Sequence, residues 1–171
     1  MLKIIATNLL GYDLLIIMVA LINGFYIYPR AKRSSIQLRD HLQPKVYVPI
    51  DLLMERIRGK NDKKMDLNAM KSMRSDEIHF YSIFTSINSA FPMLGMLGTI
   101  ISLLGMLDLS QQEVALNFTV ALTSTLWGLI FALIFKAIDA ALGPIVEQNQ
   151  ENLKLILERL DQVSRIEDAH A

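Results

Sequence analysis

Residues 90–107 form an almost wholly apolar stretch, long enough to cross a bilayer as a helix, and this stretch limits the possible folds more than any other feature. Small side chains recur along one side of it, with a proline near its start: Pro92, Gly95, Gly98, Ser102 and Gly105. Each glycine inside a helix in water costs about 1 kcal/mol relative to alanine, so a soluble core helix would rarely hold so many. In lipid, small residues let helix backbones approach closely. The stretch therefore predicts a membrane helix that packs tightly against other helices.

Two further stretches have the composition of a membrane span. The first covers residues 9–28, interrupted by Asp13 and Asn23, and the other covers residues 114–135, closed by Lys136. The first stretch lacks a small-residue cleavage site and is longer than the apolar core of a usual signal peptide, so we interpret it as a retained helix. With 52% hydrophobic residues and three such stretches, the sequence predicts an all-α integral membrane protein with three transmembrane helices and cytoplasmic helical extensions.

Basic residues predict how the helices are oriented. Residues 30–79 carry twelve Lys and Arg against seven Asp and Glu, whereas residues 108–113 carry no base. Loops rich in Lys and Arg stay in the cytoplasm. We therefore expect an N-out/C-in topology, with a cytoplasmic 30–79 segment and an external 108–113 turn. The basic side chains either contact anionic lipid or are simply solvated, and the sequence leaves both readings open.

These patterns divide the chain into six segments. They are an external N-terminus with the first transmembrane helix (1–29), a cytoplasmic basic loop (30–79), the second transmembrane helix (80–107), a short external turn (108–113), the third transmembrane helix (114–139) and a cytoplasmic amphipathic tail helix (140–171).

The tail has its own apolar stripe, formed by Leu153, Ile156, Leu160 and Val163 at steps of three and four. This spacing is typical of an amphipathic helix. So narrow a stripe suits contact between the helices of different subunits. The same stripe would also fit against the cytoplasmic loop of its own chain, and the sequence leaves both readings open.

Motifs for catalysis or metal binding do not occur in this sequence. It has no phosphate-binding loop, nucleophile elbow, dinucleotide fingerprint or zincin motif. It has no Cys, and its three His residues lie far apart. We therefore expect no enzyme activity, no catalytic residue, no metal site, no cofactor and no nucleic-acid partner.

Polar groups inside membrane spans are costly and often functional, so the candidate site lies there. Thr99 stands in the second span and Thr125 in the third, and the third span also has a small-residue face made of Ala121, Thr125, Gly128 and Ala132. The middle of these two spans contains no Asp, Glu, Lys, Arg or His. A self-sufficient proton transporter normally needs such a group. If this chain handles protons, the titrating carboxylate must come from another chain.

Two motifs resemble a known family. Residues 92–100 read Pro-Met-Leu-Gly-Met-Leu-Gly-Thr-Ile, and residues 121–129 read Ala-Leu-Thr-Ser-Thr-Leu-Trp-Gly-Leu. They are similar to the second and third helices of the ExbB/TolQ/MotA proton-channel family, especially its ExbB/TolQ branch, over about residues 80–142. This chain departs from that branch at three positions, with Ser102, Val120 and Ile134 where the branch often has Gly, Glu and Pro.

The resemblance implies a partnership in the bacterial inner membrane. It implies a homo-oligomer, expected to be a pentamer, whose second and third helices enclose the helices of a dimeric, single-span partner similar to ExbD, TolR or MotB. The partner would carry an Asp, and ion flow past it would drive a motor. The ion is expected to be the proton. The alternative is a non-conducting oligomeric membrane scaffold that recruits partners through its loop and tail.

Thr99 and Thr125 are the residues we expect to line the pore of such a ring. Each hydroxyl would bond the partner's carboxylate or a nearby water. The alternative is that each hydroxyl bonds the carbonyl four residues earlier in its own helix, as threonine commonly does in membrane helices.

Overall fold

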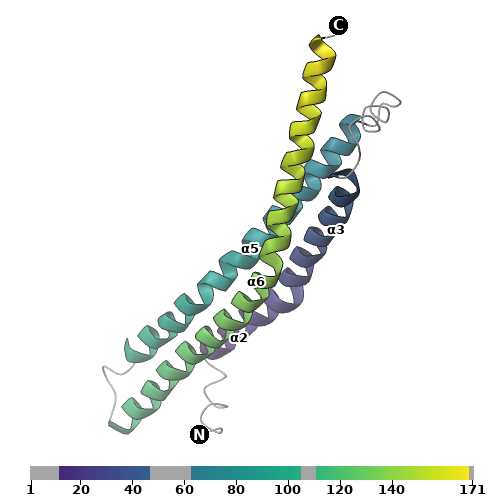
Figure 1. Ribbon diagram of the computed structural model, residues 1–171. Coiled ribbons are helices and arrows are strands. Elements are labelled where there is room, and N and C mark those ends of the chain that lie inside the picture. The colour runs from purple at the N-terminus through teal and green to yellow at the C-terminus, as the bar shows by residue number, and fades with distance from the viewer. Residues whose placement is uncertain (1–11, 47–62, 105–110, 170–171) are drawn as a thin grey trace. The chain divides into compact units, whose positions relative to one another are not determined.

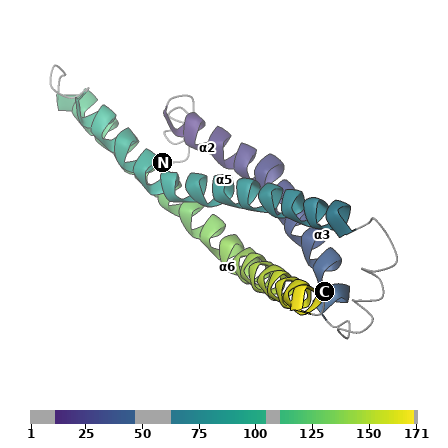
Figure 2. The ribbon, with the colours of Figure 1, turned by 90° about the horizontal axis from the view of Figure 1, so that it is seen from above.

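The computed structural model describes residues 12–46, 63–104 and 111–169, and all of these are helical. The first helical run consists of α2 (Tyr12–Ile22), the π-helix η1 (Asn23–Ile27) and α3 (Tyr28–Val46). Two long helices follow, α5 (Lys63–Leu104) and α6 (Gln111–Ala169). All of these helices can be followed in Figures 1 and 2. The first run, α5 and α6 are each long and apolar enough to cross a membrane, which confirms the predicted all-α membrane fold with three spans.

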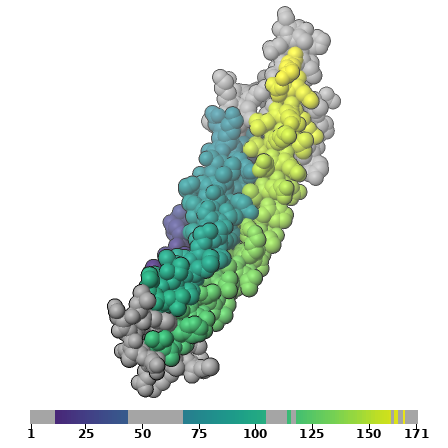
Figure 3. Space-filling view, turned by 90° about the vertical axis from the view of Figure 1, so that its left-hand side faces the viewer, coloured from purple at the N-terminus to yellow at the C-terminus, as the bar shows by residue number. Residues whose placement is uncertain are grey.

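The chain forms two compact units, each built from parts of the same three helical runs. Unit 1 comprises Met1–Pro29 and Ser82–Ala140, and unit 2 comprises Arg30–Tyr81 and Ala141–Ala171. Unit 1 holds the apolar part of each run. In the space-filling view of Figure 3, α5 in teal and α6 in green lie directly against each other within this unit.

Helix α2 and the π-helix η1 bury one face in unit 1. Their buried residues follow steps of three and four: Asp13, Ile16, Ala20, Asn23 and Ile27. The opposite face exposes large apolar side chains, such as Met18 (53% exposed) and Phe25 (82% exposed). Soluble proteins rarely expose so much contiguous apolar surface, whereas lipid covers it without cost.

Phenylalanines fill the centre of unit 1. The ring of Phe91 stacks on Phe135 with centroids 5.3 Å apart, and Phe84 meets Phe135 edge-on at 6.2 Å. Both geometries are favoured for aromatic pairs. Gly24 in η1 leaves room for Phe135, since a Cβ there would lie 3.6 Å from the Phe135 ring. The first helical run thus packs on an aromatic layer that α5 and α6 supply.

Unit 2 is a helical bundle with an apolar core of its own. One buried cluster joins Leu38 and Leu42 of α3, Met70 of α5, and Leu153 and Ile156 of α6. Leu153 and Ile156 of the predicted tail stripe therefore contact their own chain, which favours the second of the two readings for this part of the stripe. The predicted 30–79 loop contains most of α3 and the beginning of α5, because its apolar residues also recur at helical spacing.

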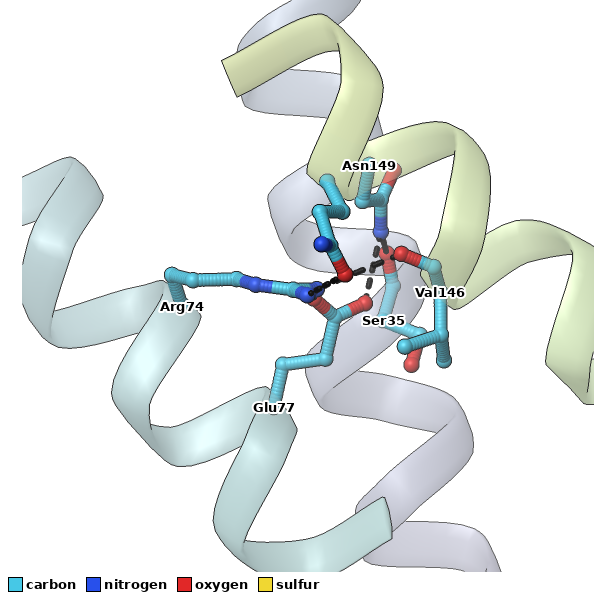
Figure 4. A network of polar contacts seen from close by, with 6 residues as sticks. Ser35, Arg74, Glu77, Val146 and Asn149 are labelled. Carbon is cyan, nitrogen blue, oxygen red and sulfur yellow. Dashed lines mark hydrogen bonds and ion pairs between the residues drawn. The ribbon is translucent and has the colours of Figure 1, made fainter. Parts of the chain in front are cut away.

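A buried asparagine links the three helical segments of unit 2 (Figure 4). Asn149 of α6 is fully buried, and its amide nitrogen donates to the Ser35 carbonyl of α3 at 2.9 Å and to the Glu77 carboxylate of α5 at 2.7 Å. Side-chain amides that bridge buried groups in this way fix the relative rotation of helices.

An arginine neutralises the buried Glu77 carboxylate of this network. Arg74 forms an ion pair with Glu77, whose side chain is 0% exposed. The same guanidinium donates to the Val146 carbonyl at 3.2 Å and to the Gln150 side chain at 2.9 Å, both on α6. A buried carboxylate requires such pairing because an unpaired charge in a protein interior is very costly.

One helix bound differs from the prediction. Helix α6 begins at Gln111, so that the last residues of the predicted 108–113 turn are already helical. The third span and the tail form one helix that continues through Pro144 to Ala169, because the proline removes only one hydrogen bond from a long helix. Gly105 lies outside the described residues.

Candidate functional site

Thr99 and Thr125, the two predicted pore residues, lie side by side in unit 1. Thr99 comes from α5 and Thr125 from α6, and their hydroxyl groups form a hydrogen bond with each other. Both side chains are partly buried. The structure therefore brings together two hydroxyl groups that are 26 residues apart in the sequence.

Each hydroxyl also has a backbone carbonyl within reach. Thr99 Oγ1 lies 3.0 Å from the Gly95 carbonyl, four residues earlier in its own helix, and 3.4 Å from the Ala121 carbonyl of α6. Thr125 Oγ1 lies 3.2 Å from the same Gly95 carbonyl, across the helix interface. The Thr99 hydroxyl therefore makes the bond within its own helix that the alternative describes, and its further contacts are to α6 of the same chain. The pore-lining role of the two threonines stays a prediction.

The hydroxyl pair has two possible proton arrangements, because each hydroxyl has a single proton to donate. Thr99 can donate to Thr125 while Thr125 donates to the Gly95 carbonyl. Alternatively, Thr125 donates to Thr99 while Thr99 donates to Gly95 or to Ala121. Both arrangements leave the pair fully bonded. A change of arrangement turns both hydroxyls toward new acceptors without moving the helices.

Glycines allow α5 and α6 to approach this closely. A Cβ on Gly95 would lie 3.1 Å from Thr125 Cα, and a Cβ on Gly128 would lie 2.7 Å from the Phe91 carbonyl oxygen and 2.9 Å from Gly95 Cα. Larger side chains would push the two backbones apart and separate the hydroxyl pair.

Gly98, unlike Gly95 and Gly128, also lies against the first helical run. A Cβ there would lie 2.6 Å from Tyr12 Cδ1 of α2 and 2.6 Å from Ser124 Cβ of α6. The three helical runs therefore meet at Gly98. Among the predicted packing residues in the described ranges, Gly95, Gly98 and Gly128 contact helices of the same chain.

For the remaining predicted packing residues, the structure shows their burial and their position in a helix. Ala121 is buried in α6, and its carbonyl faces Thr99. Pro92 stands inside α5, where its missing N–H leaves the carbonyl of Asn88 without its usual helical partner. Ser102 and Ala132 are half-buried.

Asp13 is a buried residue of unit 1 that sequence reasoning placed only at the outer boundary of the first span. Its side chain is 0% exposed, and its Oδ1 atom lies 2.5 Å from the Ser124 hydroxyl of α6. The sequence carried one signal for this contact, since a charged residue that interrupts an apolar span needs a partner inside the protein.

A second buried polar pair joins the first run to α5. Asn23 of η1 donates to the Asn88 side chain at 2.7 Å, and both residues are buried. Asn23 opens the π-helical turn, and such turns are frequent at functional sites. The sequence showed both asparagines as polar interruptions of apolar spans, but nothing in it paired them.

Charged side chains are absent from the helix segments that carry the hydroxyl pair. Residues 82–104 of α5 and 114–135 of α6 contain no Asp, Glu, Lys, Arg or His. Within the described ranges, no group of three or more His, Cys, Asp or Glu could hold a metal ion. The site therefore offers two hydroxyl groups, which can donate and accept hydrogen bonds, and backbone carbonyls, which can only accept them. These groups can hold water but have no charge of their own.

Comparison with known proteins gives one match. The family model described as the MotA/TolQ/ExbB proton channel family matches residues 40–155, a range that includes Thr99, Thr125 and the three glycines around them. No curated protein and no solved structure matches this chain.

Proposed function

Because this chain belongs to the MotA/TolQ/ExbB proton channel family, we propose that it is the ring-forming subunit of a motor driven by an ion-motive force. Proteins of this family are oligomeric membrane subunits that act with a small partner protein. In our proposal the ring is a homopentamer in the bacterial inner membrane. It encloses the helices of a dimeric, single-span partner that carries an Asp. In the same proposal the chain belongs to the ExbB/TolQ branch of the family.

The hydroxyl pair of Thr99 and Thr125 is the observation that carries this proposal. It lies between segments 82–104 of α5 and 114–135 of α6, which contain no Asp, Glu, Lys, Arg or His, so these segments cannot bind and release a proton by themselves. It can, however, stabilise a carboxyl group that a partner brings to it. A hydroxyl donates to an ionised carboxylate and accepts from a neutral acid, and the two proton arrangements of the pair serve both states.

A change of a few kcal/mol in the barrier is enough to alter the rate at which a proton passes the hydroxyl pair. The membrane potential supplies about 2.3 kcal/mol per elementary charge for each 100 mV. Leaving one polar group unbonded in an apolar passage costs about 1–3 kcal/mol. Removing a hydroxyl from the path should therefore slow ion transfer by roughly ten- to a hundredfold.

The experiment measures proton flux into vesicles that contain this chain together with its single-span partner. Thr99→Val and Thr125→Val keep the approximate side-chain volume and remove the hydroxyl. The matched control is Thr119→Val, because the Thr119 hydroxyl makes an exposed hydrogen bond to the Ala115 carbonyl of its own helix at 3.0 Å. We expect flux to fall about ten- to a hundredfold in the first two variants and to stay unchanged in the control.

Three results would contradict the proposal. Equal flux in the wild type and in the double variant would place the path elsewhere. Flux through this chain without any partner would mean that the titrating carboxylate is not supplied by another chain. A correctly assembled complex that passes no ions under an applied potential would favour the non-conducting scaffold.

A further inference from the structure

The buried amide pair of Asn23 and Asn88 leaves one hydrogen-bonding atom of each side chain unused. Asn23 Nδ2 donates to Asn88 Oδ1 at 2.7 Å, which joins η1 to α5. Asn23 Oδ1 and Asn88 Nδ2 are also buried, and neither has a hydrogen-bond partner among the described residues. Exchanging the oxygen and the nitrogen of both amides gives the same result, with one acceptor and one donor left over. The pair therefore holds a buried acceptor and a buried donor that the described part of the protein does not satisfy.

The backbone of Asn88 adds a third polar group. Pro92 has no N–H, so the Asn88 carbonyl lacks the helical donor that usually stands four residues later. Residue 88 thus offers a side-chain donor and a backbone acceptor, and Asn23 offers a second acceptor. One water molecule can accept a hydrogen bond from the donor and give one to each acceptor. Buried waters in proteins typically make about three hydrogen bonds, so the number and kind of these groups suit a water.

The surroundings of the amide pair are apolar on both helices. Four apolar residues stand three or four positions from the two asparagines and are buried: Ala20, Ile27, Phe84 and Phe91. Both asparagines lie in helices that are apolar enough to cross a membrane. Polar groups left unbonded in such an interior are costly, and most buried polar groups in proteins are bonded to protein or to ordered water.

The residues around Asn23 leave space for a small ligand. Asn23 opens the π-helical turn, and Gly24 follows it. A Cβ on Gly24 would meet the Phe135 ring at an ordinary 3.6 Å, so a group of methyl size fits there without a shift. The terminal torsion of asparagine is broad, so both amides can turn toward a shared ligand within their rotamers.

We propose that Asn23 and Asn88 form a binding site for a buried water molecule between η1 and α5. The water accepts a hydrogen bond from Asn88 Nδ2 and donates to Asn23 Oδ1 and to the Asn88 carbonyl. A cation would be repelled by the amide N–H and an anion by the two oxygens, whereas water both donates and accepts. This site involves neither Thr99 nor Thr125 and needs no partner protein, so it stands or falls independently of the proposed function.

Solid-state NMR of the full chain in vesicles of deuterated lipid tests this proposal through magnetisation transfer from water protons to side-chain amides. Only Asn23 and Asn88 follow an isoleucine in this sequence. Labelling isoleucine carbonyl carbons with ¹³C, and asparagine with ¹⁵N and ¹³C, therefore distinguishes these two from the other asparagines. We expect transfer to the Asn88 amide in the wild type and its loss in Asn23→Leu, which removes an acceptor of the water. Ser89→Ala is the control and should keep the transfer, since the Ser89 hydroxyl is exposed and bonds the Thr85 carbonyl at 3.0 Å.

The wild-type measurement decides the question even if Asn23→Leu does not fold. An Asn88 amide that receives no magnetisation from water would overturn the proposal, because the pair would then be dry. Amide hydrogens of the pair that exchange with D₂O as fast as those of Asn152 in the tail would overturn it as well, because the pair would then be open to bulk solvent. Undiminished transfer in a folded Asn23→Leu variant would show that the water does not bridge the two side chains, and would also refute the site.

Discussion

At the scale of single residues, the packing of unit 1 depends as much on its glycines, which have no side chain, as on its larger residues. Gly95 and Gly128 let two helix backbones touch, and only that approach brings the hydroxyls of Thr99 and Thr125 within bonding distance. The two threonines and the glycines are therefore one arrangement, and a change at either glycine should alter the hydroxyl pair as well.

A single methyl group should test this closeness. In Gly128→Ala the new Cβ would lie 2.7 Å from the Phe91 carbonyl oxygen, and this backbone cannot move aside freely. We expect a loss of about 1–3 kcal/mol from overpacking. The control is Gly24→Ala, whose Cβ would meet the Phe135 ring at an ordinary 3.6 Å. Thermal unfolding in detergent, followed by the fluorescence of the single tryptophan, Trp127, measures both. Equal midpoints for the two variants would refute the close approach.

The buried ion pair of unit 2 gives another prediction at this scale. Arg74→Met leaves the Glu77 carboxylate buried with only Asn149 to stabilise it. We expect a loss of about 3–5 kcal/mol, and a partial recovery when Glu77→Gln is added, because the second change removes the unpaired charge. Lys154→Met is the control, since its pair with Glu158 is 3.8 Å long and exposed. Urea unfolding followed by circular dichroism measures the differences. A double variant less stable than Arg74→Met alone would contradict this account.

At the scale of elements, the C-terminal part of α6 has a defined role within its own chain. Two residues of its apolar stripe, Leu153 and Ile156, pack against α3 and α5 and are 9% and 5% exposed. Leu155, by contrast, is 45% exposed. Among the described residues, one side of this part of α6 thus packs against α3 and α5, and the other side is exposed.

Two alanine variants separate the roles that the sequence left open for this tail. Ile156→Ala should destabilise unit 2 by about 2–5 kcal/mol, because it leaves a cavity in the apolar cluster. Leu155→Ala should have little effect on stability. Unfolding midpoints and the oligomeric mass of both variants are the measurements. If Leu155→Ala dissociates the oligomer while Ile156→Ala leaves the subunit intact, the tail acts between subunits instead.

At the scale of the whole molecule, the charge distribution predicts topology. The chain has no cysteine, so each introduced cysteine is a unique reporter. We expect Gln111→Cys at the start of α6 to react with a membrane-impermeant maleimide in intact cells. Glu151→Cys, exposed on the distal part of α6, should react only after permeabilisation. The reverse labelling pattern would exclude an external N-terminus and a cytoplasmic tail.

The proposed ring would need a surface other than the glycine face. Gly95, Gly98 and Gly128 are covered by helices of the same chain, so Gly98→Leu should prevent the subunit from folding rather than only separate subunits. Exposed apolar faces, such as that around Leu126 (55% exposed), are available to other copies and to lipid. Native mass spectrometry in mild detergent should show a homo-oligomer, expected to be a pentamer. A stable monomer under those conditions would rule out the ring.

The sequence by itself determined the three spans and the residues of the candidate site. Spans can be read from sequence because transfer into lipid depends on composition summed over about 20 residues, which needs no knowledge of neighbours. The motifs around Thr99 and Thr125 gave the family, and the match to residues 40–155 confirmed it.

Only the tertiary structure decided which surfaces meet. Helical periodicity shows that Gly95 and Gly98 share a small-residue face, but not that Thr125 covers one and Tyr12 the other. The contact of Asp13 with Ser124 joins residues 111 positions apart. Such pairings depend on the rotation and register of each helix against the others, and these are set by packing over whole helix faces rather than by local sequence.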